Sequence, residues 1–473
     1  MADQEHVDIL AKLNMAEDRT QTLEDVAALT RALLASTGRG LQLSEADLSN
    51  WDLSGADLTG ATLNRATLHG TRLRSATLDR CTMICPGMER TDLTGASVRD
   101  AYVHALAAQT CKLDGVDFRG MRDGTGSLFH GCSMRGTKLT GAHLAGCSFY
   151  QCDLEDAELA ESNLQGTLIN ECILRGTVLH GAQVDQLVIT KSDLAGLGLR
   201  RAGGEGLTLQ RAVGADDLDL TDANLPRLRM AGIRGERIRA VGLHATDLDV
   251  LDCVLPGIDL TRAALAGVRI RSSALPGALL NGATLVGGSI SASSLVGSRW
   301  ELAQAENLHV FESALAEAGM RGLTARCAVF RDVDLHGADL SEANLYRAML
   351  TGDPPRGMSL RGASLSGAIL VQAYLAADLH GADLTGVNAA YSRFSQSDLT
   401  GADVTGAALF QSAWVKVDCG GLRIDGVKPP FFVDRCPGLT EALAKTGTPS
   451  ATVLLSFIRR FADALKGEDH GST

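Results

Sequence analysis

The sequence predicts an all-β solenoid, in which the backbone winds around a narrow apolar interior, with short helical segments at both ends. The first observation behind this prediction is an apolar residue at every fifth position, beginning at Leu43. The second is a small side chain two residues before most of these positions. The third is the composition, because 52 glycines and only 4% aromatic residues favour tight turns and a thin core. Since repeats override length as a guide to domain number, we expect one repeat array with flanking segments.

The period of five determines how the backbone has to run. On a helix, successive residues of such a series would rotate by about 140° and cover every face, and on a continuous strand they would alternate between two faces. They can share one interior only if the chain turns within every unit. The first block supplies thirteen such centres in succession: Leu43, Leu48, Leu53, Leu58, Leu63, Leu68, Leu73, Leu78, Met83, Met88, Leu93, Val98 and Val103.

Each unit of five therefore consists of a small residue, a polar residue, the apolar centre and two more residues. The small residue and the centre share one face of a very short extended segment. The last two residues make a corner, where glycines such as Gly55 and Gly60 supply a backbone that tolerates turns. The chain is thus expected to wind around its own leucines.

The units ADLTG at residues 56–60 and ATLNR at residues 61–65 resemble the repeats of the pentapeptide-repeat family. The motif is specific at this copy number and continues nearly to the C-terminus. The resemblance implies a right-handed quadrilateral β-helix with four pentads in each coil. The four-sidedness comes from the resemblance, whereas the inward-pointing pattern follows from the residues themselves.

The repeat domain is predicted to span residues 41–426, with interruptions near 121–127, 200–219 and 351–357. The stretch from Ala202 to Asp219 fits the pattern least and is expected to be a loop or a distorted coil.

Two further irregularities are expected beyond that stretch. The register of the centres is predicted to shift between Met230 and Leu255. At Asp353-Pro354-Pro355, one pentad is expected to be replaced by a protruding loop, because Leu350 and Leu360 remain ten residues apart.

The open ends of such a solenoid would expose unpaired backbone, so the flanking segments are predicted to cover them. Residues 1–40 are predicted as an N-terminal helical cap, in which the sequence Thr22-Leu23-Glu24-Asp25 starts a helix. The residues expected to line one face of this helix are Leu23, Val26, Leu29 and Leu33.

Residues 427–473 are predicted as a C-terminal capping segment, in which Phe431-Phe432 precedes an amphipathic helix. Its amphipathic helix is expected to carry an apolar face of Leu454, Ile458, Phe461 and Leu465. Capping is the favoured role of this helix, and a homodimer contact or a docking site for a partner is the alternative.

Seven of the eleven cysteines stand at the small-residue position, two before a centre: Cys81, Cys111, Cys132, Cys147, Cys152, Cys172 and Cys253. They are predicted to be small buried core residues. Since there is no C-x-x-C pair, metal or redox chemistry is the weaker interpretation.

No other pattern assembles a chemical site, so no catalytic, cofactor-binding or metal-ligating residue is predicted, and no cofactor. The glycine spacing in residues 131–146 follows from the period of five and lacks the Lys-Ser/Thr order of a phosphate loop. The histidines are expected at the surface: His69, His104, His180, His244, His336 and His380. The aspartates that precede the centres recur too regularly for catalysis and are expected to be solvated: Asp47, Asp57, Asp92, Asp117, Asp153, Asp193, Asp339, Asp383 and Asp403.

The formal net charge of −12 argues against direct binding of nucleic acid through phosphate contacts. No apolar run is long enough to span a bilayer, and residues 1–10 lack the features of a signal peptide. A bacterial cytoplasmic protein is therefore predicted, with export by a non-Sec secretion system as the alternative.

The leading functional hypothesis is a non-enzymatic protein-binding scaffold whose partners bind at the interruptions of the repeat or at the terminal helices. The resemblance adds two alternatives: a DNA mimic that binds the topoisomerase DNA gyrase, and an adaptor or effector component of type VI secretion. A continuous acidic face would favour the gyrase hypothesis, whereas a patchwork of charges would weaken it.

Overall fold

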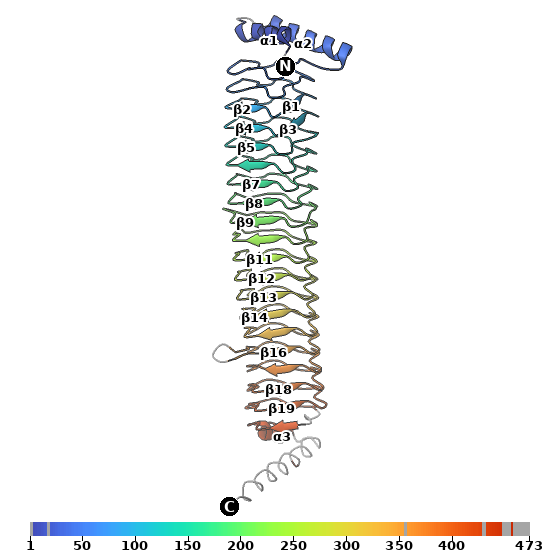
Figure 1. Cartoon of the computed structure of the whole chain (residues 1–473). Helices are drawn as coiled ribbons and strands as arrows, with labels where there is room; N and C mark the ends of the chain where they lie inside the picture. The colour runs from blue at the N-terminus through green and yellow to red at the C-terminus, as the bar shows by residue number, and fades with distance from the viewer. Residues whose placement is uncertain (1–2, 17–18, 354–356, 428–431, 447–455, 457–473) are drawn as a thin grey trace, which may run out of the picture. The chain divides into compact units, whose positions relative to one another are not determined.

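The computed structural model describes residues 3–16, 19–353, 357–427, 432–446 and 456. The chain divides into two compact units, Met1–His244 and Ala245–Thr473. Each unit is a parallel β-solenoid, in which most coils consist of four pentads and pair with the next coil about 20 residues later (Figure 1). The predicted fold class, a right-handed quadrilateral pentapeptide-repeat β-helix, is confirmed.

The four sides of a coil are numbered here in chain order. In one regular coil, side 1 is residues 303–307, side 2 is 308–312, side 3 is 313–317 and side 4 is 318–322. Short strands form mainly on side 2. On side 1, β1 (Thr82–Ile84) pairs with β3 (Tyr102–His104). The strands on side 2 of the first unit are β2 (Gly87–Glu89), β4 (Ala107–Gln109), β5 (Leu128–His130), β6 (Ser148–Tyr150), β7 (Leu168–Asn170), β8 (Val188–Thr190), β9 (Thr208–Gln210) and β10 (Arg229–Ala231).

The strands of the second unit all lie on side 2 and also pair in parallel with their neighbours. They are β11 (Asp249–Leu251), β12 (Arg269–Arg271), β13 (Ser289–Ser291), β14 (His309–Phe311), β15 (Val329–Arg331), β16 (Met349–Thr351), β17 (Tyr374–Ala376), β18 (Arg393–Ser395), β19 (Ala413–Val415) and β20 (Phe432–Asp434).

The interior consists of the centre residues and the small residues two positions before them. Leu43, Leu48 and Leu53 are fully buried, and so are Ala56 and Ala61 beside them. Burying each centre side chain contributes roughly 2 kcal/mol, so adjacent coils stabilise one another through the shared core. The inward pattern read from the sequence is confirmed.

The last residue of most pentads adopts a left-handed backbone conformation, which turns the chain through the corner. Glycine is expected there, and Gly55 has a φ of 76°. Many corners nevertheless carry larger residues, such as Arg65 at 56° and Glu161 at 58°. The repeated hydrogen bonds of the coil stabilise a conformation that costs a non-glycine residue some energy.

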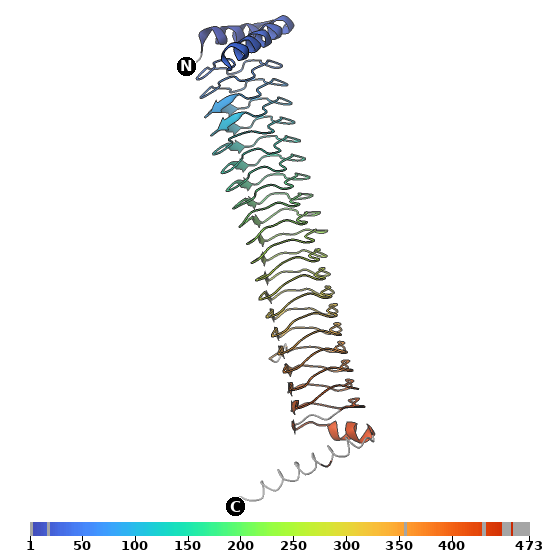
Figure 2. The same ribbon diagram turned by 90° about the vertical axis from the view of Figure 1, so that its right-hand side faces the viewer.

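Two helices cover the first coils of the first unit: α1 (Gln4–Met15) and α2 (Arg19–Thr37) (Figure 2). They meet backbone groups that have no preceding coil to pair with. His6 Nδ1 accepts from Gln42 N at 3.1 Å, Asn14 Oδ1 accepts from Asp52 N at 2.8 Å, and Thr30 Oγ1 donates to Asp57 O at 2.8 Å. The helices therefore supply hydrogen-bond partners to backbone groups at the open edge of the β-ladder.

One ion pair also joins these helices to the coils. Arg19 contacts Asp52 at 2.7 Å and donates to the carbonyl oxygens of Asp52 and Ser54. Burial acts to raise the pKa of Asp52, but hydrogen bonds from Arg19 and Ser54 overcome it and lower that pKa to about 2. The predicted helix start at Thr22 is wrong, since α2 already begins at Arg19. The sequence pattern also did not predict α1 as a separate helix.

The irregularities of the repeat are smaller than expected. One extra residue lies between the buried positions Met121 and Gly124, and another lies between Leu209 and Ala215. The segment from Ala202 to Asp219 is thus a distorted coil rather than a loop, and it contains β9.

The predicted register shift between Met230 and Leu255 is wrong. Gly235 and Ala240 occupy the buried centre positions in the first unit, and Ala245 and Val250 do so in the second. The period of five is unbroken there, but these small centres hide it in the sequence.

The predicted replacement of a pentad at residues 351–357 is also wrong, because five residues are inserted. Met349 pairs with Tyr374 and Asp334 with Ser359, both 25 residues apart instead of 20. The prolines Pro354 and Pro355 lie outside the described residues.

At the end of the second unit, the ladder continues past the predicted boundary at residue 426. β20 pairs with β19, and Cys419 N donates to Pro437 O at 2.8 Å. The helix α3 (Leu439–Thr446) follows and buries Leu439, Ala442 and Leu443. The predicted helix with Leu454, Ile458, Phe461 and Leu465 lies outside the described residues, as does Phe431.

Candidate interaction surfaces

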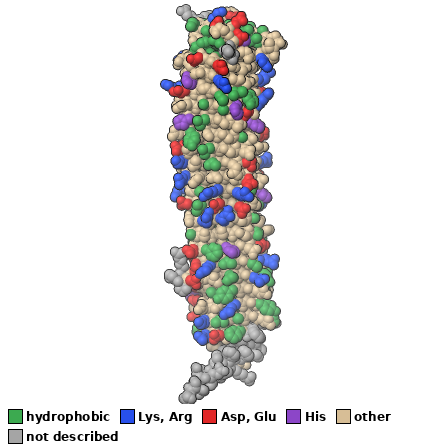
Figure 3. All heavy atoms as spheres, viewed as in Figure 1, with side chains coloured by type: hydrophobic (Ala, Val, Ile, Leu, Met, Phe, Trp, Pro, Cys, Tyr) green, Lys and Arg blue, Asp and Glu red, His purple; other side chains and the backbone are tan. Residues whose placement is uncertain are grey.

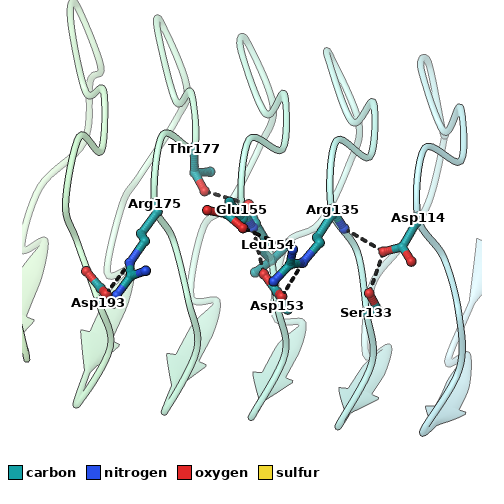
Figure 4. A network of polar contacts seen from close by, with 9 residues as sticks. All are labelled: Asp114, Ser133, Arg135, Asp153, Leu154, Glu155, Arg175, Thr177 and Asp193. Atoms are coloured by element: carbon teal, nitrogen blue, oxygen red, sulfur yellow. Dashed lines mark hydrogen bonds and ion pairs between the residues drawn. The ribbon is translucent and has the colours of Figure 1, made fainter.

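The outer surface of side 3 in the first unit is a chain of paired charges (Figure 4). Arg135 Nε donates to Asp153 in the next coil at 2.5 Å, and Arg175 Nε donates to Asp193 at 2.6 Å. Ser133 and the backbone N–H of Arg135 donate to Asp114. Because positive and negative groups alternate from coil to coil, this part of side 3 is a patchwork rather than an acidic face.

The recurring aspartates have a structural function that the sequence interpretation missed. Each of the nine accepts a hydrogen bond from the backbone N–H two residues later, as Asp383 does from Thr385 at 2.9 Å. This side-chain-to-backbone bond stabilises the turn that follows. Asp92 and Asp117 are buried and pair with Arg74 and Arg99, so the prediction that all nine are simply solvated is wrong for these two.

The cysteine prediction is confirmed, because all seven cysteines at the small-residue position are buried and none forms a disulfide. Burial raises the pKa of Cys81 and of Cys147 to about 12, so their thiols stay protonated at neutral pH. Cys147 Sγ also donates to the carbonyl oxygen of Gly124 in the preceding coil at 2.8 Å. The exposed thiols are those of Cys85 and Cys327.

The histidines lie on the outer surface, as predicted, and two of them contact carboxylates: His104 faces Asp123 at 3.2 Å and His336 faces Asp334 at 2.9 Å. Among the described residues, no group of three or more His, Cys, Asp or Glu side chains is placed to hold a metal ion. Within the same residues, no helix is both long and apolar enough to cross a membrane.

The interruptions predicted as contact regions take up little space in the structure. The extra residue near Asp123–Ser127 is absorbed within the coil, and the one near Val213 leaves that side chain 77% exposed. The helices α1 and α2 pack on the coils of their own unit. None of these places presents a group of exposed apolar side chains.

The insertion after β16 borders a shallow depression on side 3. Arg331 donates to the carboxylate of Asp353 at 2.6 Å, and the backbone N–H of Asp353 donates to the carboxylate of Asp332 at 2.7 Å. The depression is lined chiefly by Glu312, Asp332, Asp334, His336 and Arg361. Three of its nine lining residues are acidic and only Ala314 has an apolar side chain, so the depression offers no large apolar side chain to a partner.

An exposed aromatic surface lies instead along the corner between sides 1 and 2 of the second unit. We call it the aromatic patch, and it comprises Tyr346, Met349, Val371, Tyr374, Tyr391 and Phe410. Met349, Tyr391 and Phe410 are 45%, 51% and 56% exposed, and Ile369 beside them is 37% exposed. Figure 3 shows hydrophobic side chains gathered over the coils that carry β15 to β19.

The members of the aromatic patch come from consecutive coils, and some of them are held by contacts with neighbouring side chains. Tyr391 and Phe410 meet edge to face, with ring centroids 5.5 Å apart. Tyr346 donates from its hydroxyl to Gln372 at 3.1 Å, and the guanidinium of Arg326 lies 5.5 Å above its ring. Such mutual packing fixes side chains that would otherwise be mobile on the surface.

The charge around the aromatic patch is opposite to that of the protein as a whole. In the five coils between residues 323 and 426, sides 1 and 2 carry five basic residues and one acidic residue, whereas sides 3 and 4 carry two basic and nine acidic residues. Arg347 and Arg393 adjoin the patch, are exposed, and form no ion pair with any described residue. The patch is thus an apolar and cationic surface on an acidic protein.

The recurrence of apolar residues at every fifth position did not predict this surface, because that pattern does not distinguish one outward position from another. The members of the patch are separated by about 20 residues, and the insertion after β16 hides that spacing in the sequence. Three of the five tyrosines of the chain fall in the patch, and aligning the sequence by coil would have brought them together.

The geometry defines a class, that of the parallel β-solenoid repeat proteins. The family model for pentapeptide repeats matches eight copies, at residues 42–80, 125–156, 320–352 and 377–412. With four pentads in most coils and buried centres in the pentads, the coils of this chain consist of pentapeptide repeats.

The solved structures that match the chain include pentapeptide-repeat proteins. QnrB1, a plasmid-mediated fluoroquinolone resistance protein, is 16% identical, with a TM-score of 0.19 over 51% of this chain and 90% of its own. HetL from the cyanobacterium Nostoc, involved in heterocyst differentiation regulation, is 18% identical, with a TM-score of 0.12 over 80% of this chain and 94% of its own. No curated protein sequence matches the chain.

Proposed function

We propose that this protein is a non-enzymatic binding scaffold and that the aromatic patch is its contact surface for a protein partner. The observation that carries the proposal is the exposure of Tyr391 and Phe410 in contact with each other, within a group of six apolar and aromatic residues. In a chain with only 4% aromatic residues, this concentration is costly to leave in water.

The composition of the patch is that of a protein interface. Tyrosine, phenylalanine, methionine and arginine are enriched where proteins bind one another, and tyrosine and arginine often contribute most of the binding energy. Tyr346 and Arg326 are already held in place by their mutual contact, so less side-chain entropy is lost on binding. The proposal replaces the interruptions of the repeat as the main contact region.

Affinity purification with three versions of the protein tests the proposal. The wild type is compared with the variant Tyr391→Ser/Phe410→Ser and with a control, Asp383→Asn/Asp403→Asn, whose residues lie on side 4 in the same part of the second unit. Both variants alter surface positions and leave the buried centres intact. Partners identified by mass spectrometry are then purified and their binding is measured directly.

We expect a partner that binds the wild type and the control with similar affinity and the patch variant at least about tenfold more weakly, which corresponds to 1.4 kcal/mol. Equal binding of a purified partner to all three proteins would contradict the proposal.

The acidic sides favour a second candidate, the DNA mimic that binds gyrase. On side 3, Asp378, Asp398 and Asp418 pair with one another in successive coils, which aligns three carboxylates. Against it, side 3 of the first unit carries alternating charges. A supercoiling assay decides between the candidates. This candidate is supported if the protein inhibits or protects gyrase and the effect is lost when Asp378, Asp398 and Asp418 are changed to Asn. It is excluded if excess protein has no effect. The type VI adaptor hypothesis remains a prediction from resemblance.

A further inference from the structure

We propose that the partner segment bound by the aromatic patch is an acidic amphipathic α-helix that lies along the stacking direction of the coils. This inference rests on the proposed function and specifies the chemistry of the partner. Three features of the patch lead to it: its charge, its spacing and the arrangement of its apolar side chains.

The charge of the patch selects an acidic partner. Arg393 lies beside Tyr374 in the adjacent coil, as their strand pairing shows. Arg347 directly follows Tyr346 of the patch, and its backbone N–H donates to Val371 O in the next coil at 2.9 Å. Because neither arginine has an ion-pair partner among the described residues, a carboxylate that approaches them gains an interaction without breaking an existing one. A basic partner would be repelled by the same two groups.

The spacing of the patch suits a helix better than a strand. Neighbouring coils are about 4.8 Å apart, so the outer side chains of side 1 recur at that interval. A helix has a pitch of 5.4 Å and presents apolar residues at i, i+3 or i+4, and i+7, about once for each coil. A strand presents same-side residues only about every 6.7 Å and falls out of register with the coils sooner.

The arrangement of side chains on side 1 offers a place for such a helix. Ala390, between Val371 in one neighbouring coil and Phe410 in the other, carries a small side chain in a row of larger ones. Tyr391, at the corner next to Ala390, contacts the Phe410 ring edge to face. A leucine or isoleucine of the partner can therefore contact three aromatic or apolar side chains at once.

A second copy of the chain fits the patch less well. The charge-complementary surface of a second copy would be sides 3 and 4 of the same coils. Their outward residues are chiefly Asp, Ser, Thr, His and Gly, as at Asp398, Thr400 and Gly401, so they offer no apolar side chains to meet the aromatic rings. We therefore assign the patch to a separate polypeptide.

The test uses synthetic peptides of 15 residues and the full-length protein. One peptide has leucines at i, i+3, i+4 and i+7 spacing with glutamates on the flanks, and a second has lysines in place of the glutamates. A third has the composition of the first in an order that removes the amphipathic pattern. Binding is measured by fluorescence anisotropy at low and at moderate salt.

We expect the acidic amphipathic peptide to bind at least about tenfold more tightly than the other two, and more weakly as salt rises. The variant Arg347→Glu/Arg393→Glu should lose this preference and favour the basic peptide, whereas Asp383→Asn/Asp403→Asn should behave as the wild type. Both arginines are exposed, so the thermal midpoint of the arginine variant is expected to agree with that of the wild type, and the midpoints of all versions serve as the folding control.

Several results would overturn the inference. Equal binding of the scrambled acidic peptide rejects the helix, and equal binding of the basic peptide rejects the charge argument. Self-association that is lost in Tyr391→Ser/Phe410→Ser assigns the patch to a second copy, and tight binding of an oligothymidine assigns it to nucleic acid. If the peptides fail but a purified partner still depends on Tyr391 and Phe410, the partner class is wrong while the scaffold proposal stands.

Discussion

The two pairs of sides in the last coils of the second unit share one interior but present different surfaces. Both pairs enclose buried centre residues of the same core, such as Leu370 on side 1 and Leu384 on side 4. On the outer surface, sides 1 and 2 carry aromatic rings and arginines, whereas sides 3 and 4 carry aspartates.

The difference is not required by the fold. Asp383 on side 4 accepts from the backbone N–H of Thr385 at 2.9 Å, and Asn388 on side 1 accepts from Ala390 in the same way at 3.3 Å. An amide therefore stabilises the turn on side 1 where a carboxylate does so on side 4. Because the negative charge is dispensable for the turn, its absence from side 1 points to selection of the surface for another purpose, which we propose is binding.

The largest expected effect concerns the shared interior. Leu370→Ala and Leu384→Ala each remove a fully buried side chain and should each lower the free energy of unfolding by about 2–5 kcal/mol. Denaturant unfolding followed by circular dichroism measures both. If only one of the two variants is destabilised, the sides do not share one continuous core.

An intermediate effect concerns the turns. Asp383→Ala and Asn388→Ala both remove the acceptor of a backbone N–H, and each should cost about 1 kcal/mol. Asp383→Asn and Asn388→Asp keep the acceptor and should cost less than half of that. A large loss in Asp383→Asn would show that the charge itself is structural and would weaken the comparison.

The smallest expected effect is a dependence of stability on pH that comes from the acidic sides. Burial acts to raise the pKa of Asp403, but hydrogen bonds from Thr405 and the charge of Arg423 at 3.2 Å hold that pKa below its usual value. A carboxyl group with a lowered pKa stabilises the fold above about pH 4, and this contribution is lost as the pH falls through the lower folded value.

The thermal midpoint of the wild type should therefore fall slightly more between pH 7 and pH 3 than that of Asp403→Asn. Identical decreases in the two proteins would mean that Asp403 contributes no pH-dependent stability.

The sequence predicted the fold because the buried positions obey a strict local rule. Every fifth residue from Leu43 has to face the interior, and residues such as Cys147 and Cys152 fit the small position beside it. The rule failed where the centres are small, as at Gly235 and Ala240, since such residues do not stand out from the corners.

The surface could not be predicted in the same way, because outward positions obey no local rule. Tyr346, Tyr391 and Phe410 come together only when coils of unequal length are stacked. The first turn of α2 and the separation of α1 were missed because polar residues there bond to the open edge of the coils, as Asn14 does to Asp52. Such contacts depend on the tertiary structure.

Site-specific photo-crosslinking tests the central claim most directly. A photoreactive phenylalanine analogue is placed at position 391 in the aromatic patch and, in a separate protein, at position 398 on side 3, and both proteins are irradiated in the cells that produce them. We expect position 391 to yield a discrete adduct, which mass spectrometry identifies as one protein with an acidic amphipathic segment, and position 398 to yield none. Adducts from position 398 alone, or the same adduct from both positions, would contradict the assignment of the aromatic patch as the binding surface.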